Sequence, residues 1–223
     1  MIAKKIERVS ARKGYDLWSR TYDSTPNPVV AMDSRYTVRL LSPQPGEAIL
    51  DAGSGTGRNL KELLQAGSLP IGIDFSHGMV KVAQENYSDV PIALADLDRP
   101  LPFRDESFDA VLCSLIGEHL SAPGGVFQEF HRVLKTGGRL AFSVYHPAMS
   151  AAGIEANFEQ EGIEYRLGAF HYTVQEHIEL FESTGFANIA VKEFAGDETL
   201  VSSLPSAAKY LGFPVLLVLT ANK

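Results

Sequence analysis

From residue 48 onward, short apolar runs alternate with stretches in which apolar residues recur at helical spacing. The run at residues 48–50 precedes Leu60, Leu63 and Leu64, which are spaced as on one face of a helix. Such an alternation predicts an α/β protein with a doubly wound, mostly parallel, seven-stranded Rossmann-like sheet. The expected strands span residues 48–50, 69–74, 91–96, 108–114, 139–145, 189–194 and 214–220.

Helix boundaries are indicated by residues that favour helix ends. Ser121 or Pro123 is expected to open one helix, and Gly137 with Gly138 to end it. Another helix is predicted over residues 174–184.

Two segments interrupt the alternation of strands and helices. Residues 1–46 look helical and carry an aromatic cluster of Tyr15, Trp18 and Tyr22, so we expect an N-terminal helical cap. Residues 147–172 are rich in glycine and aromatic residues, and long insertions of this kind are often functional lids. We expect residues 1–223 to form a single domain, with a lid over residues 147–172.

Composition and charge narrow the classes of function. The formal net charge is −7, which argues against a nucleic-acid partner because phosphate binding needs a basic field. The basic residues between Lys4 and Lys13 include Glu7 and lack an apolar core, so we expect a solvated helix there rather than a secretory signal or a binding arm. Cys113 has no second cysteine to pair with, and no apolar run approaches the roughly 20 residues of a membrane span. We expect a cytoplasmic protein without a membrane span or a metal site.

Glycine occupies every second position from residue 53 to residue 57, directly after the apolar run that ends in Asp51. Gly53, Gly55 and Gly57 permit unusual dihedrals and a close approach of a ligand to the backbone. The dinucleotide fingerprint requires its third glycine where this chain has Arg58. The carboxylate of Asp51 favours a cationic ligand group over a pyrophosphate. The loop therefore favours a cationic cofactor without phosphate, with a ligand-free glycine-rich turn as the simpler alternative.

Polar residues lie at the ends of four predicted strands, and they are Asp51, Asp74, Asp96 and Ser114. In an open parallel sheet, ligands bind beyond the carboxyl ends of the strands. Asp74 lies close to the spacing at which an acid binds ribose hydroxyls. Any one of these acids alone is as well explained as a cap or loop residue, but three beside a glycine loop favour a ligand site.

Three further segments resemble the class I S-adenosylmethionine (SAM)-dependent methyltransferases related to ubiquinone and menaquinone biosynthesis. They are residues 101–109 (LPFRDESFD), residues 130–138 (FHRVLKTGG) and residues 15–23 (YDLWSRTYD). Thr136 stands where the family has proline. The resemblance covers most of residues 15–145, whereas residues 147–223 match only in outline.

The resemblance implies how SAM is held. The glycine loop should form the floor of the site, Asp74 should bind the ribose, and Asp96 should bind the adenine. Tyr22 should close over the methionine carboxylate, whereas Tyr15 and Trp18 are as well explained as a hydrophobic stripe of the first helix. The full set of expected cofactor-binding residues is Tyr22, Asp51, Gly53, Ser54, Gly55, Gly57, Asp74, Phe75, Met79, Asp96, Leu97, Ser114 and Leu115.

Methyl transfer from SAM is an in-line displacement, so alignment is the main task of the protein. A hydroxyl or an acidic carbon as acceptor also needs a base, and histidine is the natural choice near neutral pH. His119, His146 and His171 are equal candidates, although each is as well explained as a structural histidine. An amine or thiol acceptor needs less help, and all three could then be spectators.

The sequence argues against a macromolecular acceptor. The stretch that follows residue 112 lacks the Asn/Asp-Pro-Pro-aromatic element of methyltransferases that modify planar nitrogens, and Cys113 reads as buried and inert. We therefore expect methyl transfer to a small, partly apolar molecule held under residues 147–172. The alternatives are a nicotinamide-dependent oxidoreductase on a related sheet and a non-catalytic protein that binds SAM.

Overall fold

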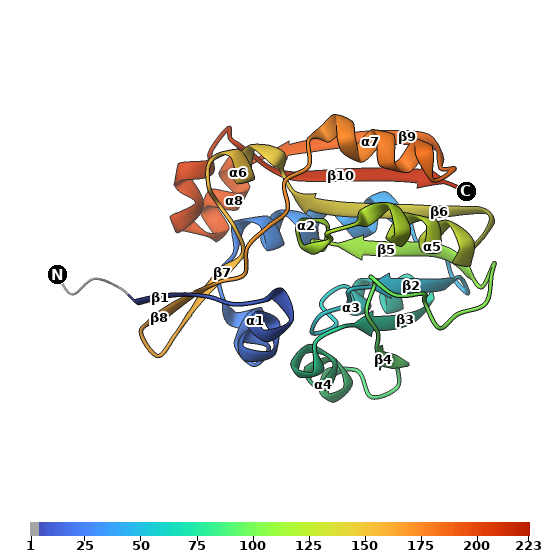
Figure 1. Ribbon diagram of the computed structural model, residues 1–223, viewed down its shortest axis with the longest axis horizontal. Coiled ribbons are helices and arrows are strands. Elements are labelled where there is room, and N and C mark those ends of the chain that lie inside the picture. Colours follow the sequence, from blue (N-terminus) through green and yellow to red (C-terminus); the bar gives the residue numbers. More distant parts are fainter. Residues whose placement is uncertain (1–4) are drawn as a thin grey trace.

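A seven-stranded sheet organises the computed structural model, which describes residues 5–223 (Figure 1). Its strand order is β4-β3-β2-β5-β6-β10-β9. All neighbouring strands are parallel except β10, which runs antiparallel to both β6 and β9. The predicted α/β fold is confirmed. The strands are β2 (Ala48–Ala52), β3 (Leu69–Asp74), β4 (Ile92–Leu94), β5 (Phe108–Ser114), β6 (Leu134–Tyr145), β9 (Ala187–Ala195) and β10 (Pro214–Asn222).

Helices cover both faces of this sheet because side chains alternate along each strand. Leu50 of β2 lies in a buried cluster with Phe127 and Phe181 from helices α5 and α7. The next residue back, Ile49, lies in a second cluster with Leu63 and side chains of the helices on the other face. The helices of the two layers are α5 (Pro123–Val133) and α7 (Val174–Ser183), and α2 (Pro28–Leu41), α3 (Leu60–Gln65) and α4 (His77–Asn86).

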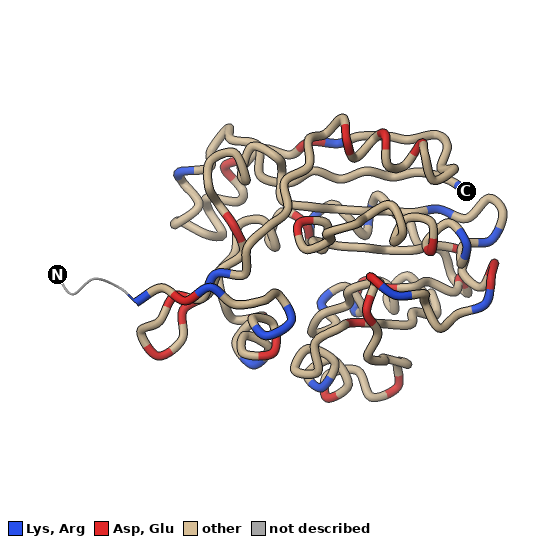
Figure 2. The backbone as a smooth tube through the Cα atoms, viewed as in Figure 1, with Lys and Arg blue, Asp and Glu red and all other residues tan. Residues whose placement is uncertain are grey.

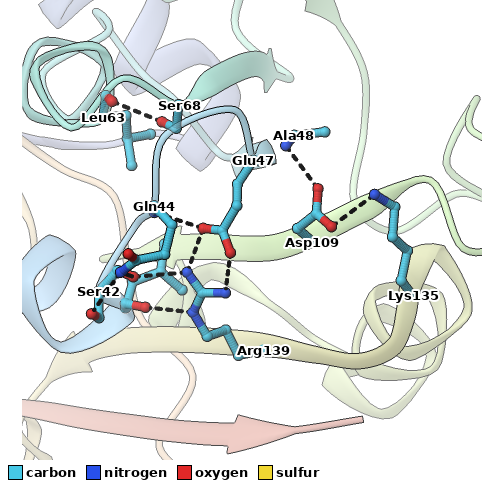
Figure 3. Close-up of polar contacts among 10 residues, drawn as sticks. Ser42, Gln44, Glu47, Ala48, Leu63, Ser68, Asp109, Lys135 and Arg139 are labelled. Atoms are coloured by element: carbon cyan, nitrogen blue, oxygen red, sulfur yellow. Dashed lines mark hydrogen bonds and ion pairs between the residues drawn. The ribbon is translucent and has the colours of Figure 1, made fainter.

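The edge of the sheet away from the strand ends that carry the acids is held by ion pairs (Figure 3). Arg139 of β6 donates to both carboxylate oxygens of Glu47 and to the carbonyl of Ser42. Asp109 of β5 accepts from the backbone N–H of Ala48 at 2.9 Å and from Lys135. These contacts join β2, β5 and β6 to the end of α2 before the chain reaches the candidate site.

The N-terminal segment differs from the expected helix. Residues Lys5–Arg8 form a strand, β1, which pairs in parallel with β8 (Ile163–Arg166). Helix α1 (Ala11–Trp18) begins only after Ser10, whose side chain accepts from the backbone of Lys13. The expectation of a solvated helix through the basic segment was therefore wrong over β1, because its pairing partner lies far away in the sequence. Lys4 lies outside the described residues.

Residues 147–172 form a helix and a hairpin rather than an irregular loop. Helix α6 (Pro147–Ala151) is followed by β7 (Asn157–Gln160), which pairs antiparallel with β8. Phe158 of this hairpin stacks on Trp18 of α1 at a ring-centroid distance of 4.9 Å. The inserted segment and the N-terminal segment therefore build one layer beside the main sheet, as Figure 1 shows.

Two other boundaries differ from the prediction. Helix α5 ends at Val133 and β6 begins at Leu134, so Gly137 and Gly138 lie within a strand rather than ending the helix. The pairing of β5 with β6 is irregular between Phe108 and Ala110, which accommodates the early part of β6. Helix α8 (Glu198–Ser203) and the 3₁₀ helix η3 (Pro205–Tyr210), which lie between the last two strands, were not predicted.

Acidic and basic side chains are interspersed along the described chain (Figure 2). Within the basic N-terminal segment, Arg12 pairs with Asp96 at 2.6 Å and Arg8 with Glu155 at 3.3 Å. These pairs reduce the positive field that a binding arm would need. No helix within residues 5–223 is both long and apolar enough to cross a membrane.

Candidate active site

Two adjoining cavities lie at the carboxyl ends of β2, β3 and β5. The first holds about 460 Å³ of space between atoms and the second about 430 Å³, and both volumes include space open to solvent. They share a wall, so together they form one elongated site at the sheet edge where open α/β sheets bind ligands. The shared residues are Tyr15, Gly53, Asp74, Phe75 and Ile116.

The glycine loop forms the floor of the first cavity. Gly53, Gly55 and Gly57 all have positive φ, between 56° and 86°, a region that suits glycine. A Cβ on Gly53 would meet Ile116 at 2.5 Å, and one on Gly57 would meet the ring of Tyr87 at 2.8 Å. A Cβ on Gly55 would meet nothing within 4 Å, so this glycine leaves open space for a ligand.

Asp74 is fixed where β3 meets α4. Its carboxylate accepts from the backbone N–H groups of Gly55 at 2.9 Å and of Ser76 at 2.8 Å. Burial raises the pKa of Asp74 to about 6, against the lowering effect of these two hydrogen bonds. Phe75 and Met79 line the first cavity beside it. The carboxylate therefore faces both cavities from a rigid position and keeps lone pairs for further donors.

Asp96 and Leu97 lie in the second cavity, as the sequence predicted, together with His119. The carboxylate of Asp96 is already engaged, because it accepts from Arg12 of α1 at 2.6 Å and from the backbone of Asp98 at 3.1 Å. A ligand that used Asp96 would share it with this arginine.

Arg58 supplies a cation to the first cavity, a role that its position in the glycine loop did not predict. Its guanidinium donates to the fully buried Asp33 of α2 at 2.7 Å and to Ser114 at 3.0 Å. Asp33 also accepts from the hydroxyls of Thr37 and Ser143. Four polar side chains from α2, β5 and β6 therefore hold one guanidinium in place. In the sequence, only Asp33, an acidic residue on the apolar face of α2, could have indicated this network.

Two expected cofactor residues do not line the cavities. Asp51 is fully buried beneath the loop, and among the described residues neither of its carboxylate oxygens has a hydrogen-bond partner. Burial raises the pKa of Asp51 to about 7. Gly57 packs against Tyr87, as described above. Ser54 lines the first cavity, but its hydroxyl is turned to the sheet beside Gly72 and has no hydrogen-bond partner within residues 5–223.

The N-terminal aromatic residues close the site from above the sheet. Tyr15 and Tyr22 both line the first cavity, whereas Trp18 is buried in the cluster that contains Phe158. The Tyr15 hydroxyl lies 2.8 Å from Nε2 of His119 and so joins α1 to the segment after β5. Thr56 of the glycine loop donates to Asp23 at 2.7 Å, which fixes the turn that carries Tyr22.

The three candidate histidines have different surroundings. His119 lines the second cavity, and burial lowers its pKa to about 4, so its ring is neutral at pH 7. His146 caps α6, where Nδ1 accepts from the backbone of Ala148 and Nε2 lies 2.8 Å from Glu193. His171 is exposed. The structure therefore brings only His119, of the three, to the cavities.

Glu118 was not among the predicted residues. It lies beside His119 in the 3₁₀ helix η2 (Gly117–His119), and its carboxylate is buried without a hydrogen-bond partner. An acid next to a histidine after the fourth strand of the main sheet was visible in the sequence, but its burial was not.

Comparison with known proteins finds a family match for the central part of the chain. Residues 50–142 match the family described as methyltransferase domain. Demethylmenaquinone methyltransferases of Corynebacterium kroppenstedtii and Renibacterium salmoninarum are 35% and 33% identical to the chain over 130 and 150 residues. These alignments cover 56% and 65% of this chain, and 56% and 62% of the relatives. The chain therefore spans less than two thirds of the length of these relatives.

Solved structures share the fold over most of the chain. An S-adenosylmethionine-dependent methyltransferase from Mesorhizobium loti aligns with a TM-score of 0.72 at 24% identity, covering 87% of this chain and 100% of that one. Phosphoethanolamine N-methyltransferase 2 of Haemonchus contortus, in complex with S-adenosyl-L-methionine, aligns with a TM-score of 0.65 at 19% identity, covering 85% and 52%. The chain is therefore similar to methyltransferases over residues 50–142, and its β4-β3-β2-β5-β6-β10-β9 sheet has the fold of these solved SAM-dependent methyltransferases.

Proposed function

We propose that the protein transfers a methyl group from SAM to a small-molecule acceptor. The observation that carries this proposal is the elongated double cavity, with a glycine floor, a cation at one end and carboxylates along its length. SAM has the complementary pattern of groups: a carboxylate and an ammonium at one end, a sulfonium, a ribose diol and an adenine.

The residues of the first cavity fit the methionine and ribose parts of SAM. Arg58 would pair with the methionine carboxylate, and the open space at Gly55 would admit the ligand close to the backbone. Asp74 would accept hydrogen bonds from the ribose hydroxyls.

The residues of the second cavity fit an adenine. Leu97 and Ile116 provide apolar surface, and Asp96 would accept from the exocyclic amine while it keeps its contact with Arg12. Because the two cavities share Asp74, the ribose would lie at the junction between them.

SAM supplies a methyl group that its sulfonium already activates, so the chain has to orient the reactants and exclude water. Tyr15 and His119 hold α1 across the site through one hydrogen bond. Since His119 is neutral and engaged with Tyr15, we assign it a positioning role rather than proton transfer. The layer built from β1 and residues 147–172 packs against α1 through the stacked rings of Trp18 and Phe158. We propose that this layer acts as a lid for a small acceptor.

Replacement of Asp74 tests the proposal at the junction of the cavities. Asp74→Ala removes the acceptor for the ribose hydroxyls, so the affinity for S-adenosylhomocysteine (SAH) should fall by about 10- to 100-fold. Isothermal titration calorimetry measures this change, and Asp89→Ala, at an exposed aspartate, is the matched control. Equal affinity of the Asp74 variant and the wild type would refute the ribose assignment.

A further inference from the structure

Asp16 of helix α1 contacts the segment that fixes Asp74. Its Oδ1 accepts from the hydroxyl of Ser76 at 2.6 Å and from the backbone N–H of Gly78 at 2.9 Å. Ser76 is fully buried, and its backbone N–H donates to the carboxylate of Asp74. A chain of hydrogen bonds therefore runs from α1 through Ser76 to the acid that lines both cavities.

The hydrogen bonds of Ser76 leave its hydroxyl proton for Asp16. As the N-cap of α4, the side-chain oxygen of Ser76 accepts from the backbone N–H of Met79 at 3.1 Å, so the hydroxyl donates to Asp16. Helix α4 has no acidic residue in its own first turn. Asp16 brings a negative charge to this helix end, where an anion is favoured. The carboxylate of Asp16 thus stabilises the start of α4, which is the place where Asp74 is held.

Helices α1 and α4 are in direct contact at this point, because Gly78 leaves no room for a side chain. A Cβ on Gly78 would meet the hydroxyl oxygen of Ser19 at 2.6 Å and the carbonyl oxygen of Asp16 at 2.9 Å. The hydroxyl of Ser19 donates to the same carbonyl at 3.0 Å. The position of the end of α1 therefore constrains the position of the start of α4.

Two ion pairs flank Asp16, four residues before it and four residues after it. Arg12 pairs with Asp96 and Arg20 with Glu85, both at 2.6 Å. Each of these four side chains is at least 36% exposed, and exposed ion pairs contribute little to stability. Asp16 is itself exposed, but it differs from both arginines because its hydrogen-bond partner is buried.

The contact between Asp16 and Ser76 joins the two sides of the junction between the cavities. Tyr15 directly precedes Asp16, and Asp74 lies two residues before Ser76. Tyr15 and Asp74 both line the two cavities, so they face the junction from α1 and from the end of β3. The hydrogen bond between Asp16 and Ser76 therefore helps to set the separation of these two residues.

We propose that Asp16 is a positioning residue for the cofactor ribose, and that it acts through Ser76 to hold Asp74 where the ribose diol can donate to it. This inference rests on the proposed function, which puts the ribose at the junction of the cavities. Asp16 lines neither cavity, so it acts on the ligand only through its neighbours.

Calorimetry with SAH on variants of the full chain tests this assignment. Asp16→Ala removes both accepted hydrogen bonds, so the affinity for SAH should fall about tenfold. Asp16→Asn keeps an oxygen that accepts from Ser76 and Gly78, so it should restore most of the affinity. The matched control is Arg20→Gln, which breaks a neighbouring ion pair between α1 and α4 and should bind SAH as the wild type does.

A double-mutant cycle tests the route through Asp74. If Asp16 acts by positioning Asp74, Asp16→Ala should cause little further loss of SAH affinity in a chain that already carries Asp74→Ala. A tenfold loss in both backgrounds would show that the two residues act independently, which overturns the inference.

Thermal unfolding without ligand separates this role from a purely structural one. Because Asp16 is exposed, we expect the Asp16→Ala chain to fold and to unfold close to the temperature of the wild type. A lowered unfolding temperature with unchanged SAH affinity overturns the inference, as does an equal loss of affinity in Arg20→Gln. Failure of the wild type to bind SAH would instead overturn the proposed function itself.

Discussion

At the scale of single residues, Arg58 shows most clearly that the role of a side chain depends on its partners. In the sequence, Arg58 argued against a dinucleotide-binding loop, because such a loop needs glycine at this position. In the structure it becomes the cation of the first cavity, held by Asp33 and Ser114. Its partners come from α2 and β5, so no local pattern around residue 58 could have shown the network.

Replacement of Arg58 should reveal which part of the ligand it binds. Arg58→Met is expected to weaken SAH binding by about 10- to 100-fold, because the methionine carboxylate loses its charged partner. Binding of 5′-methylthioadenosine, which lacks that carboxylate, should change little. Calorimetry of both ligands, with Arg39→Met on the exposed side of α2 as control, measures the difference. Equal losses for both ligands would mean that Arg58 only supports the fold.

At the scale of elements, the strands of the main sheet were predicted well because each is a short apolar run with a polar end. The acids at Asp74 and Asp96 could be placed beside the loop for the same reason, since parallel strands end at one edge. Strand β1 could not be predicted, because its sequence, Lys5–Arg8, becomes a strand only by pairing with residues 163–166. Glu118 was missed for a related reason, since the segment that pairs with its backbone, at Phe170, lies far along the chain.

The hydrogen bond between Tyr15 and His119 is one of the contacts that hold helix α1 across the site. Tyr15→Phe removes that hydrogen bond and keeps the ring, so we expect SAH affinity to fall by up to about tenfold while the fold persists. Thermal unfolding and calorimetry together separate the two effects. The matched control is Tyr165→Phe in β8, whose ring packs on Phe158 away from the cavities. A large drop in unfolding temperature without ligand would instead indicate that the contact is structural.

At the scale of the whole molecule, the cost of burying carboxyl groups should appear in the pH dependence of stability. Burial raises the pKa of Asp51 and Glu118 to about 7 and that of Asp74 to about 6. A raised pKa means that the folded state holds its proton longer, so this contribution is present at low pH and is lost as pH rises toward 7. His119, with its lowered pKa of about 4, acts in the opposite direction over the same range.

Burial also lowers the pKa of His131 and of His177, but the large upward shifts of the three carboxyl groups outweigh the three histidines and give a net prediction. Without ligand, the free energy of unfolding should decrease as pH rises from about 4.5 to about 7, by about 1.4 kcal/mol per pK unit for each carboxyl group. Urea unfolding at a series of pH values measures this. Glu118→Gln should show a shallower decrease than the wild type, and Glu182→Gln, at an exposed glutamate of α7, should not. A stability that rises steadily over this range in the wild type would contradict the assignment of these carboxyl groups.

The proposed function depends on the double cavity being a SAM site. The most direct measurement is a calorimetric titration of the wild-type chain with SAH, run beside the same titration with NADH. We predict saturable binding of SAH in a one-to-one ratio and no binding of NADH. Binding of NADH alone, or of neither ligand, would contradict the account.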